Sequence, residues 1–341
     1  MSSTTARMAA TLAAVATSLL MISAVPAVAQ PNAVVLLDNL SSPKGITLEA
    51  DQNLSIAQGA FGSPGPVLLY TRHGRDRGEQ PVTDPVGLID IASAGDTGWG
   101  ITSDDPRTLL RADETGSIEA VLNITEYQAA HPDPNDTNGD PQGSNPYGLA
   151  ALPNGDALVS DAQHNDLLRV TPSGDVTLVA RFLPEVIGGI PAEAVPTTVT
   201  IGPDGWAYVG ELKGYPFEPG TSRIWRINPN ADGATCSSSG SSGGCSPYAS
   251  GFTAIQDIAF NPHNGALYVY ELAADGVLAF EEGFGSGDFP DAVLLKVHRG
   301  RQTELAAGQL SEPGGIVVAR DGTVFVTDGI FTGGRLLQVR G

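Results

Sequence analysis

A hairpin-rich unit recurs along most of the chain, and this internal repeat limits the possible folds more than any other feature of the sequence. Each copy reads as an apolar strand, a turn built on Gly, Asp or Asn, and a second alternating strand, which is the pattern of a β-hairpin. The copies begin at Pro43, Pro85, Pro146, Pro196, Asp257 and Pro313. From Pro43 to Pro313 there are five steps in 270 residues, or 54 per step. A period of this length predicts propeller blades of four strands each.

The two ends of the chain share one copy of the repeat. The sixth copy supplies strands near residues 316–319, 323–328 and 335–340, and it lacks a fourth strand. We expect residues 33–38 to pair with residues 335–340, because they match the outer strand that leads into another copy. The predicted fold class is therefore all-β, a six-bladed β-propeller whose last blade is closed by the N-terminal strand. A two-domain β-sandwich is the alternative, and it gives no reason for both ends to share one repeat.

The first 29 residues have the character of a secretory signal peptide. Arg7 is their only charge, an apolar run follows, and Ala27-Val28-Ala29 is a small-x-small cleavage site. An uncleaved membrane anchor is the alternative, but Pro26 and the absence of positive flanks favour cleavage after Ala29. Residues 30–341 are then a single propeller domain in a secreted product, in an extracellular or periplasm-like space.

The net negative charge of the chain excludes some classes of binding partner. The chain has 18 Lys+Arg against 38 Asp+Glu, a formal net charge of −20. Binding to nucleic acid needs a positive footprint, so we expect no nucleic-acid partner, and no membrane contact once the signal is removed. With 42 Gly and 25 Pro, long helices are disfavoured. We expect a monomer that meets an unknown extracellular ligand.

Two cysteines occur in the chain. Cys236 and Cys245 bracket a Ser/Gly run, and in an oxidising compartment they predict a small local disulfide. Two thiols with no His nearby in sequence make a zinc site a poor interpretation.

Loop lengths distinguish the two faces of the expected propeller. Turns after the first and third strands are tight, whereas the long connections follow the second strand (59–66, 212–222, 272–291) or the fourth (123–144, 182–195, 246–251). In an up-and-down blade these long connections emerge on one face. We expect function on this elaborated face.

Four of the second strands end in an acid at the same repeat position, namely Asp161, Glu211, Glu271 and Asp328. The first blade has Gln58 there, and for the second blade we expect Ile101. One interpretation is a ring of carboxylates at the mouth of the central channel, able to hold a hard cation or attract a positive ligand. In the other, favoured here, each acid accepts N–H groups of its own loop and fixes the blade.

A second acidic feature lies in the long connection before Ser144. Its oxygen-bearing residues are Asp133, Asn135, Asp136, Asn138 and Asp140. The alternation around Gly139 resembles part of a calcium loop, but the twelfth position from Asp133 is Ser144 in place of Glu. A solvated turn is the favoured interpretation, with Ca²⁺ as the one metal that the sequence suggests.

Several motifs resemble the ScyD/ScyE family of secreted propeller proteins. They include Tyr127-Gln128-Ala129-Ala130, the run from Ser144 to Leu149, Val209-Gly210-Glu211-Leu212 and Asp257-Ile258-Ala259-Phe260. The resemblance is strong from about residue 126 to 328 and weaker in the first two blades. It implies a six-bladed propeller related to NHL-type repeats, in a family named for genes associated with biosynthesis of a cyanobacterial sunscreen pigment. It supplies no catalytic residue set.

Three functions fit the sequence. The leading one is a secreted, non-enzymatic scaffold that binds a protein, glycan or small molecule on its long-loop face. A metal-dependent hydrolase or lactonase with a calcium-type ion near the channel is the second. A quinone-type oxidoreductase is the third, for which the only basic cluster is Arg72, His73, Arg75 and Arg77.

Overall fold

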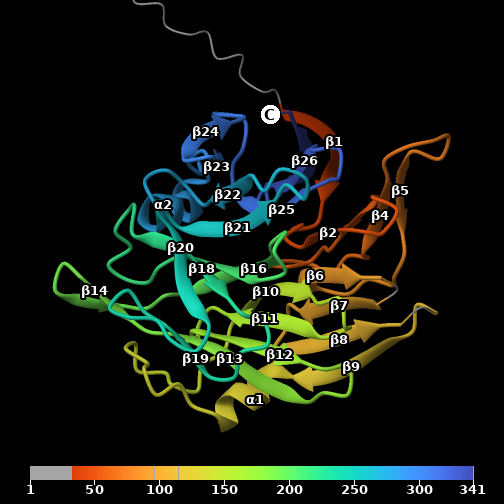
Figure 1. The fold of residues 1–341 in the computed structure, drawn as a ribbon. Coiled ribbons are helices and arrows are strands. Elements are labelled where there is room, and N and C mark those ends of the chain that lie inside the picture. The colour runs from red at the N-terminus through yellow and green to blue at the C-terminus, as the bar shows by residue number, and fades with distance from the viewer. Residues whose placement is uncertain (1–32, 96, 114, 341) are drawn as a thin grey trace, which may run out of the picture.

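The computed structural model describes residues 33–95, 97–113 and 115–340. The expected signal peptide, residues 1–29, lies outside this range. The described residues form six blades of antiparallel strands arranged in a ring (Figure 1), which confirms the predicted six-bladed β-propeller. No helix among them is long and apolar enough to cross a bilayer.

The first three blades follow the chain in order. Blade 1 consists of β2 (Ile46–Leu48), β3 (Leu54–Ile56), β4 (Leu68–Thr71) and β5 (Gly78–Pro81). Blade 2 consists of β6 (Leu88–Ala94), β7 (Thr97–Thr102), β8 (Thr108–Ala112) and β9 (Ile118–Asn123). Blade 3 consists of β10 (Pro146–Ala151), β11 (Ala157–Asp161), β12 (Asp166–Val170) and β13 (Val176–Phe182), extended by the parallel strand β19 (Ala234–Cys236).

The last three blades complete the ring. Blade 4 consists of β16 (Pro196–Ile201), β17 (Ala207–Glu211), β18 (Ser222–Ile227) and β20 (Cys245–Phe252). Blade 5 consists of β21 (Ile255–Phe260), β22 (Leu267–Glu271), β23 (Val293–His298) and β24 (Arg301–Leu305). Blade 6 consists of β25 (Pro313–Val318), β26 (Val324–Asp328), β27 (Gly334–Val339) and, from the other end of the chain, β1 (Ala33–Leu40).

The N-terminal strand closes the ring as expected. β1 pairs antiparallel with β27, with Ala33 opposite Val339 and Leu40 opposite Gly334. In Figure 1 the red β1 lies beside the dark blue C-terminal strands. Because the first described strand of the chain pairs with the last, blade 6 has its full four strands and β27 is not an exposed edge. The ring of blades is thereby closed.

The first strand of every blade lies innermost. β2, β6, β10, β16, β21 and β25 each contact the first strands of the two neighbouring blades. Glycines allow this approach, because a Cβ on Gly45 would lie 2.8 Å from Asp90 Cα, and one on Gly315 would lie 2.7 Å from the Lys44 carbonyl oxygen. The chain keeps glycine where neighbouring backbones almost touch.

Several long connections contain ordered structure. Residues 246–251, expected to be a connection, belong to β20 and form the outer strand of blade 4. The connection at 123–144 contains α1 (Ile124–Ala130), that at 182–195 contains the hairpin β14 (Glu185–Ile187) and β15 (Ile190–Ala192), and that at 272–291 contains α2 (Val277–Ser286). These insertions all lie on loops of the elaborated face.

The predicted disulfide is present. Cys236 on β19 is bonded to Cys245 at the start of β20, with a Cα–Cα distance of 5.5 Å. Both cysteines are buried in the core cluster shared by blades 3 and 4, together with Trp225. The bond therefore fastens the extra strand of blade 3 to the outer strand of blade 4.

Candidate functional site at the channel mouth

Two buried carboxylates and one buried amine occupy the inner strands. Asp90 and Asp257 are the third residues of the inner strands of blades 2 and 5. The same repeat position holds Gly45, just before β2, and Gly148, Thr198 and Gly315 in the other blades. Lys44, 3% exposed, places its Nζ 3.8 Å from Asp90 Oδ2. We call Lys44, Asp90 and Asp257 the axial cluster.

Backbone and hydroxyl groups hold the two carboxylates. Asp90 Oδ2 accepts the N–H of Leu149 at 2.9 Å, and Asp257 Oδ2 accepts that of Ile316 at 2.8 Å. Burial raises the pKa of Asp90 to about 6, with Lys44 opposing the rise and Asp257 adding to it. Burial also raises the pKa of Asp257, again opposed by Lys44. The axial cluster therefore takes up protons more readily than surface carboxylates do.

Three side chains from alternate blades meet above the axial cluster. Lys44 Nζ donates to the Tyr147 carbonyl oxygen at 2.8 Å and lies 4.2 Å from the centre of the Tyr147 ring. Gln256 Nε2 donates to Tyr147 Oη at 3.0 Å. Blades 1, 3 and 5 are not neighbours, so these contacts cross the axis and obstruct the channel. Tyr147 and Gln256 are the second residues of β10 and β21, and Lys44 holds the equivalent repeat position just before β2, close to the long-loop face.

An aromatic cluster lies beside this obstruction, on loops that follow the second strands. The ring of Phe61 in blade 1 is 6.3 Å from that of Tyr147 and 5.1 Å from that of Phe331 in blade 6. Phe331 is in turn 4.9 Å from Phe284 of α2 in blade 5. Phe61, Phe284 and Phe331 are 41%, 59% and 38% exposed. We call these three residues the aromatic surface.

Buried aromatic residues support the aromatic surface from below. The ring of Phe280, which is buried, lies 5.8 Å from Phe284 and 6.1 Å from Phe331. Phe289 lies 5.1 Å from Phe284, and it packs with Phe280 in a small core cluster under α2. The exposed rings of Phe284 and Phe331 therefore pack against other aromatic side chains, which hold them in place.

The structure does not bring the four strand-end acids together. Asp161 accepts from Ser144 Oγ at 2.6 Å and from the N–H groups of Asn145, Gln163 and His164. Glu271 accepts from the N–H of Thr253 at 2.8 Å. Each of these carboxylates is turned to donors of its own blade and its approach loop, as in the second interpretation of the sequence.

Asp328 and Glu211 have side-chain partners as well. Asp328 accepts from the hydroxyl of Tyr270 and the N–H of Ser311, both at 2.9 Å, and it pairs with Arg335. Burial raises the pKa of Asp328 to about 6 and that of Glu271 to about 7.

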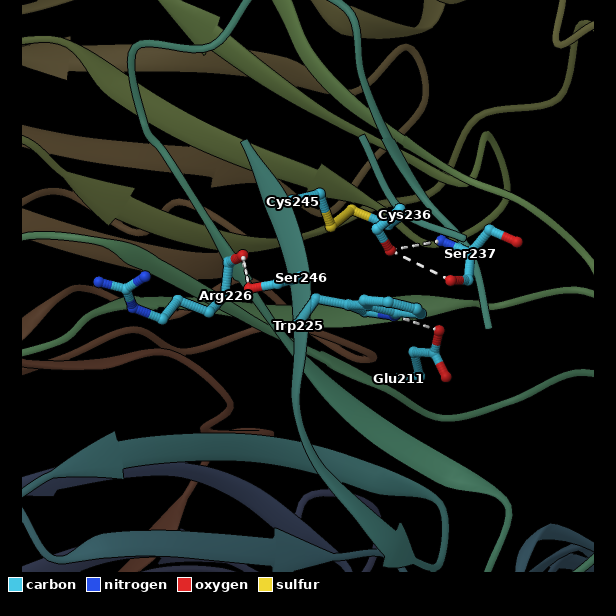
Figure 2. The surroundings of a disulfide bond; sticks show 8 residues. Glu211, Trp225, Arg226, Cys236, Ser237, Cys245 and Ser246 are labelled. Atoms are coloured by element: carbon cyan, nitrogen blue, oxygen red, sulfur yellow. Dashed lines mark hydrogen bonds between the residues drawn. A yellow bond between two sulfur atoms is a disulfide. The ribbon is translucent and has the colours of Figure 1, made fainter. Parts of the chain in front are cut away.

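Glu211 belongs to a buried charge network near the disulfide. Its Oε1 accepts from Trp225 Nε1 at 2.5 Å, as Figure 2 shows, and its Oε2 lies 2.8 Å from Lys213 Nζ. Arg223 pairs with Glu185 at 2.5 Å, and Lys213 lies 3.6 Å from the same carboxylate. Two acids and two bases thus neutralise one another, and the network anchors the hairpin β14–β15 to blade 4.

The acidic loop folds onto itself and onto Glu193. Asp133 Oδ1 accepts from the N–H of Asn135 at 2.9 Å, Asp136 Oδ2 from that of Gly139 at 2.8 Å, and Asn138 Oδ1 from that of Asp140 at 3.0 Å. Glu193 accepts from Thr137 and Asn138. Among the described residues, no three His, Cys, Asp or Glu side chains are grouped so as to hold a metal ion.

The basic cluster is also engaged elsewhere. Arg72 is buried, donates to Asp321 Oδ2 at 2.8 Å and lies 4.6 Å from the centre of the Phe325 ring. It joins blade 1 to blade 6. Arg77 donates to the hydroxyl of Tyr70 in its own blade.

The residues that approach the axis are ones that the motif search missed. Two adjacent positions of the repeat hold these residues, which are Lys44, Asp90, Tyr147, Gln256 and Asp257, and the positions come immediately before Ile46, Ile91, Leu149 and Ile258. Aligning the six copies at these positions, where the residue types differ most, would have found them.

Ring closure, blade number and blade order together define the class of this protein as a six-bladed β-propeller. Solved structures of that architecture are similar to it. A glucose dehydrogenase aligns with TM-score 0.58 and 14% identity over 91% of this chain and 99% of that one. The PQQ-bound aldose sugar dehydrogenase from Streptomyces coelicolor gives 0.54 and 13%, over 92% and 98%. A streptogramin B lyase gives 0.51 and 15%, over 91% and 96%.

At these identities the likeness concerns the fold alone. No protein-family model matches the chain, and no curated protein sequence matches it.

Proposed function

We propose that the protein is a secreted, monomeric binding scaffold that takes an apolar or aromatic extracellular ligand on the long-loop face. The observation that carries the proposal is the aromatic surface, in which the rings of Phe61, Phe284 and Phe331 are exposed and in contact with one another beside the obstructed channel mouth. Exposed, contiguous aromatic rings on rigid supports mark binding sites more often than single exposed residues do.

The chemistry of the aromatic surface favours an apolar ligand. Its three members are Phe, which offers ring faces and edges but no hydrogen-bonding group. The polar groups of Tyr147, Lys44 and Gln256 already bond to one another. Glu312 and Ser42 accept the backbone N–H groups of Phe331 and Phe61. A ligand would gain from burying apolar area over the rings, with Tyr147 at the edge for orientation.

Secretion is supported by the signal-like residues 1–29 and by the disulfide, since disulfides persist in oxidising compartments. We also propose membership of the ScyD/ScyE family, supported by the motifs between residues 126 and 328. The six-bladed ring is the fold that such membership implies.

The enzymatic alternatives have less support at the mouth. A calcium-dependent hydrolase would need acid oxygens directed at one point, whereas Asp161, Glu211, Glu271 and Asp328 accept hydrogen bonds in their separate blades. A quinone cofactor would need basic residues and a His facing it. Lys44 is buried against Asp90, and Arg72 packs between blades 1 and 6, so the residues near the axis do not fit such a group.

The test is loss of hydrophobic-dye binding. Nile red, a neutral dye whose fluorescence rises in apolar sites, should bind the wild-type protein. The triple variant Phe61→Ala, Phe284→Ala, Phe331→Ala should lose about fivefold in affinity, because such anchors dominate apolar binding. The control Tyr215→Ala, Val186→Ala removes two exposed apolar side chains elsewhere on the same face, at 62% and 70% exposure. Equal dye binding by the triple variant and the control would refute the proposal.

A further inference from the structure

Five of the six blade interfaces are filled by one rule. One residue near the start of each second strand, at the same repeat position, packs a large side chain against the next blade: Trp99 against blade 3, Leu158 against blade 4, Tyr208 against blade 5, Tyr268 against blade 6 and Phe325 against blade 1. Blade 1 has Ser55 at this position, so the interface between blades 1 and 2 lacks the large side chain.

Blade 2, on the other side of the same interface, also lacks large side chains at the contact positions. In five blades two aliphatic residues of the second strand accept the neighbour's large side chain, as Val324 and Val326 accept Tyr268. The strand register places Gly98 and Gly100 of β7 at these two positions in blade 2, with Gly100 opposite Ile91. Three small residues thus meet at one interface where every other interface joins a large one to two aliphatic ones.

A cleft of about 450 Å³ occupies this interface. Its walls are mostly apolar and include Val67, Val82, Leu88, Leu110 and Ile118. Val82 and Ile118 are about half exposed, so the cleft opens to solvent at the outer side of the two blades. Its size is within the range of about 300–1,000 Å³ that is typical of small-molecule sites.

Polar groups of both blades line part of the cleft. Ser55 Oγ donates to Glu49 Oε1 at 2.5 Å, and both residues line the cleft. The hydroxyls of Thr47 and Ser93, also in the lining, lie 3.5 Å apart. The lining holds two carboxylates, of which Asp113 already accepts the N–H groups of Thr115 and Ser117 in its own turn. An apolar slot with Glu49 and a few hydroxyls has the composition of a ligand site.

Backbone geometry does not require glycine at position 98. Gly98 has no positive φ, and a Cβ there would meet only Ala112 Cβ, at 3.5 Å, which is an ordinary contact. At Gly100 a Cβ would lie 3.3 Å from a Leu88 methyl group, a tighter fit that a small shift relieves. A larger residue could therefore fill the space, as aliphatic residues do in the other blades.

We propose that the cleft between blades 1 and 2 is a second ligand site, separate from the channel mouth, for a small, largely apolar ring compound that carries a hydroxyl or amino group. The ring lies between Gly98, Gly100 and the valine and leucine walls, where side chains of other interfaces would be. The donor group of the ligand is directed to the carboxylate of Glu49. The proposal is independent of the aromatic surface.

The experiment uses 2-naphthol as the probe. In titrations followed by amide NMR shifts, 2-naphthol at about 1 mM should move the signals of Gly98 and Gly100. The filled variant Ser55→Phe, Gly98→Val copies the residues of the other interfaces, and it should bind about tenfold more weakly while melting no lower than the wild-type protein. Ser173→Phe, on an exposed turn of blade 3, is the control for an added Phe and should bind like the wild-type protein.

Two further arms keep the test decisive. Glu49→Gln should weaken 2-naphthol severalfold but leave 2-methoxynaphthalene, which has no donor, unchanged. If the filled variant does not fold, Gly98→Ala alone should weaken binding, because its Cβ fits without a clash. The proposal is overturned if 2-naphthol moves neither the Gly98 nor the Gly100 signal in the wild-type protein. It is also overturned if the filled variant melts higher but binds 2-naphthol as well as the wild-type protein does, because the cleft would then be only a defect in the packing between blades 1 and 2. The triple Phe variant of the mouth should leave binding at the cleft intact.

Discussion

Asp90 and Asp257 hold the same repeat position in blades 2 and 5, three blades apart in a ring of six. Each accepts the N–H of the residue 59 positions later, Leu149 or Ile316, on the inner strand of the next blade. The two carboxylates therefore fasten two opposite seams of the ring in the same way. Burial raises the pKa of both carboxyls, and Lys44 is the cation that opposes this rise. Burying the charges of Asp90 and Asp257 beside the single amine of Lys44 costs free energy, and this cost falls when one of the carboxylates takes up a proton.

Stability should fall as the pH rises from about 5 to 8. The pKa values of Asp90 and Asp328 are raised to about 6 and that of Glu271 to about 7 by burial. Over this pH range the folded state binds more protons than the unfolded state. The stabilisation from these three carboxyls is therefore complete below their pKa values in the unfolded state, and it is lost as the pH rises through their pKa values in the folded state. Urea unfolding at several pH values measures the trend.

Glu271→Gln should flatten the upper part of that profile, since an amide oxygen still accepts the Thr253 N–H but does not titrate. Stability should also fall as the pH drops below about 4. Hydrogen bonds and cationic partners lower the pKa of Glu185 and Asp321 in the folded state, and the stabilisation from these contacts is lost when the two carboxylates are protonated. A stability that increases steadily from pH 5 to 8 would contradict the assignment.

Lys44→Met should destabilise the protein at pH 8 by about 3 kcal/mol, because it leaves Asp90 and Asp257 buried without their cation. At pH 5 the loss should be much smaller, since both carboxyls can be protonated. Guanidinium unfolding at the two pH values measures the difference. Lys296→Met, on β23 beside the Tyr268 ring, is the matched control and should show no such pH dependence. A pH-independent loss at Lys44 would mean that it acts through packing alone.

Gly315→Ala should cost about 1–3 kcal/mol, because the new Cβ would lie 2.7 Å from the Lys44 carbonyl oxygen and would push two inner strands apart. Gly333→Ala, with no atom within 4 Å of its Cβ and no positive φ, should change stability by less than about 0.5 kcal/mol. Thermal melts of the two variants provide the comparison. Similar melting points would show that the inner ring adjusts to the added methyl group.

A chain that begins at residue 41 should melt well below one that begins at residue 30. The shorter chain lacks β1, so β27 becomes an open edge, and Leu36, Leu37 and Leu40 no longer cover the core between blades 6 and 1. Size-exclusion chromatography should also show association through the open edge. Unchanged melting and a clean monomer peak would mean that β1 adds little to the ring.

Calcium and a chelator should leave the melting temperature unchanged. The oxygens of Asp133, Asp136 and Asn138 accept hydrogen bonds from turn N–H groups within their own loop. A ligand that binds only the native state must raise the transition, so calorimetry with Ca²⁺ and with EDTA checks the point. A rise with Ca²⁺ would restore the calcium interpretation of this loop.

The repeat allowed most of the fold to be predicted from sequence. Its turns use residues that tolerate unusual backbone angles, such as Gly155 and Gly322, and each is flanked by buried apolar strands. The pairing of the two chain ends followed from one missing strand. The outer strand of blade 4 was not predicted, since Cys245–Phe252 has Ser, Pro and Tyr at exposed positions and little apolar alternation.

The site was harder to predict, because it depends on which strand side faces the axis. The strand-end acids were found by their shared position, but their donors, such as Trp225 and Tyr270, lie on other strands and gave no local signal. In blade 2 the expected residue was Ile101, and the structure places Thr102 there. Leu88 pairs with Thr102 as Pro146 pairs with Asp161, and the same irregularity follows this pair in both blades. Blade 2 has no acid there and no Asp-Gly or Asn-Gly turn to mark the position, so the sequence pattern gave the wrong residue.

The pairing of β1 with β27 also sets a timetable for the nascent chain. The strand that completes blade 6 is made before any other described strand, whereas its partner, Gly334–Val339, is the last described strand to be synthesised. Until that segment is free, the first strand has no mate and the circle stays open. Closure of the ring must therefore wait until Gly334–Val339 has been translated, and a product that terminates before this strand keeps β1 unpaired.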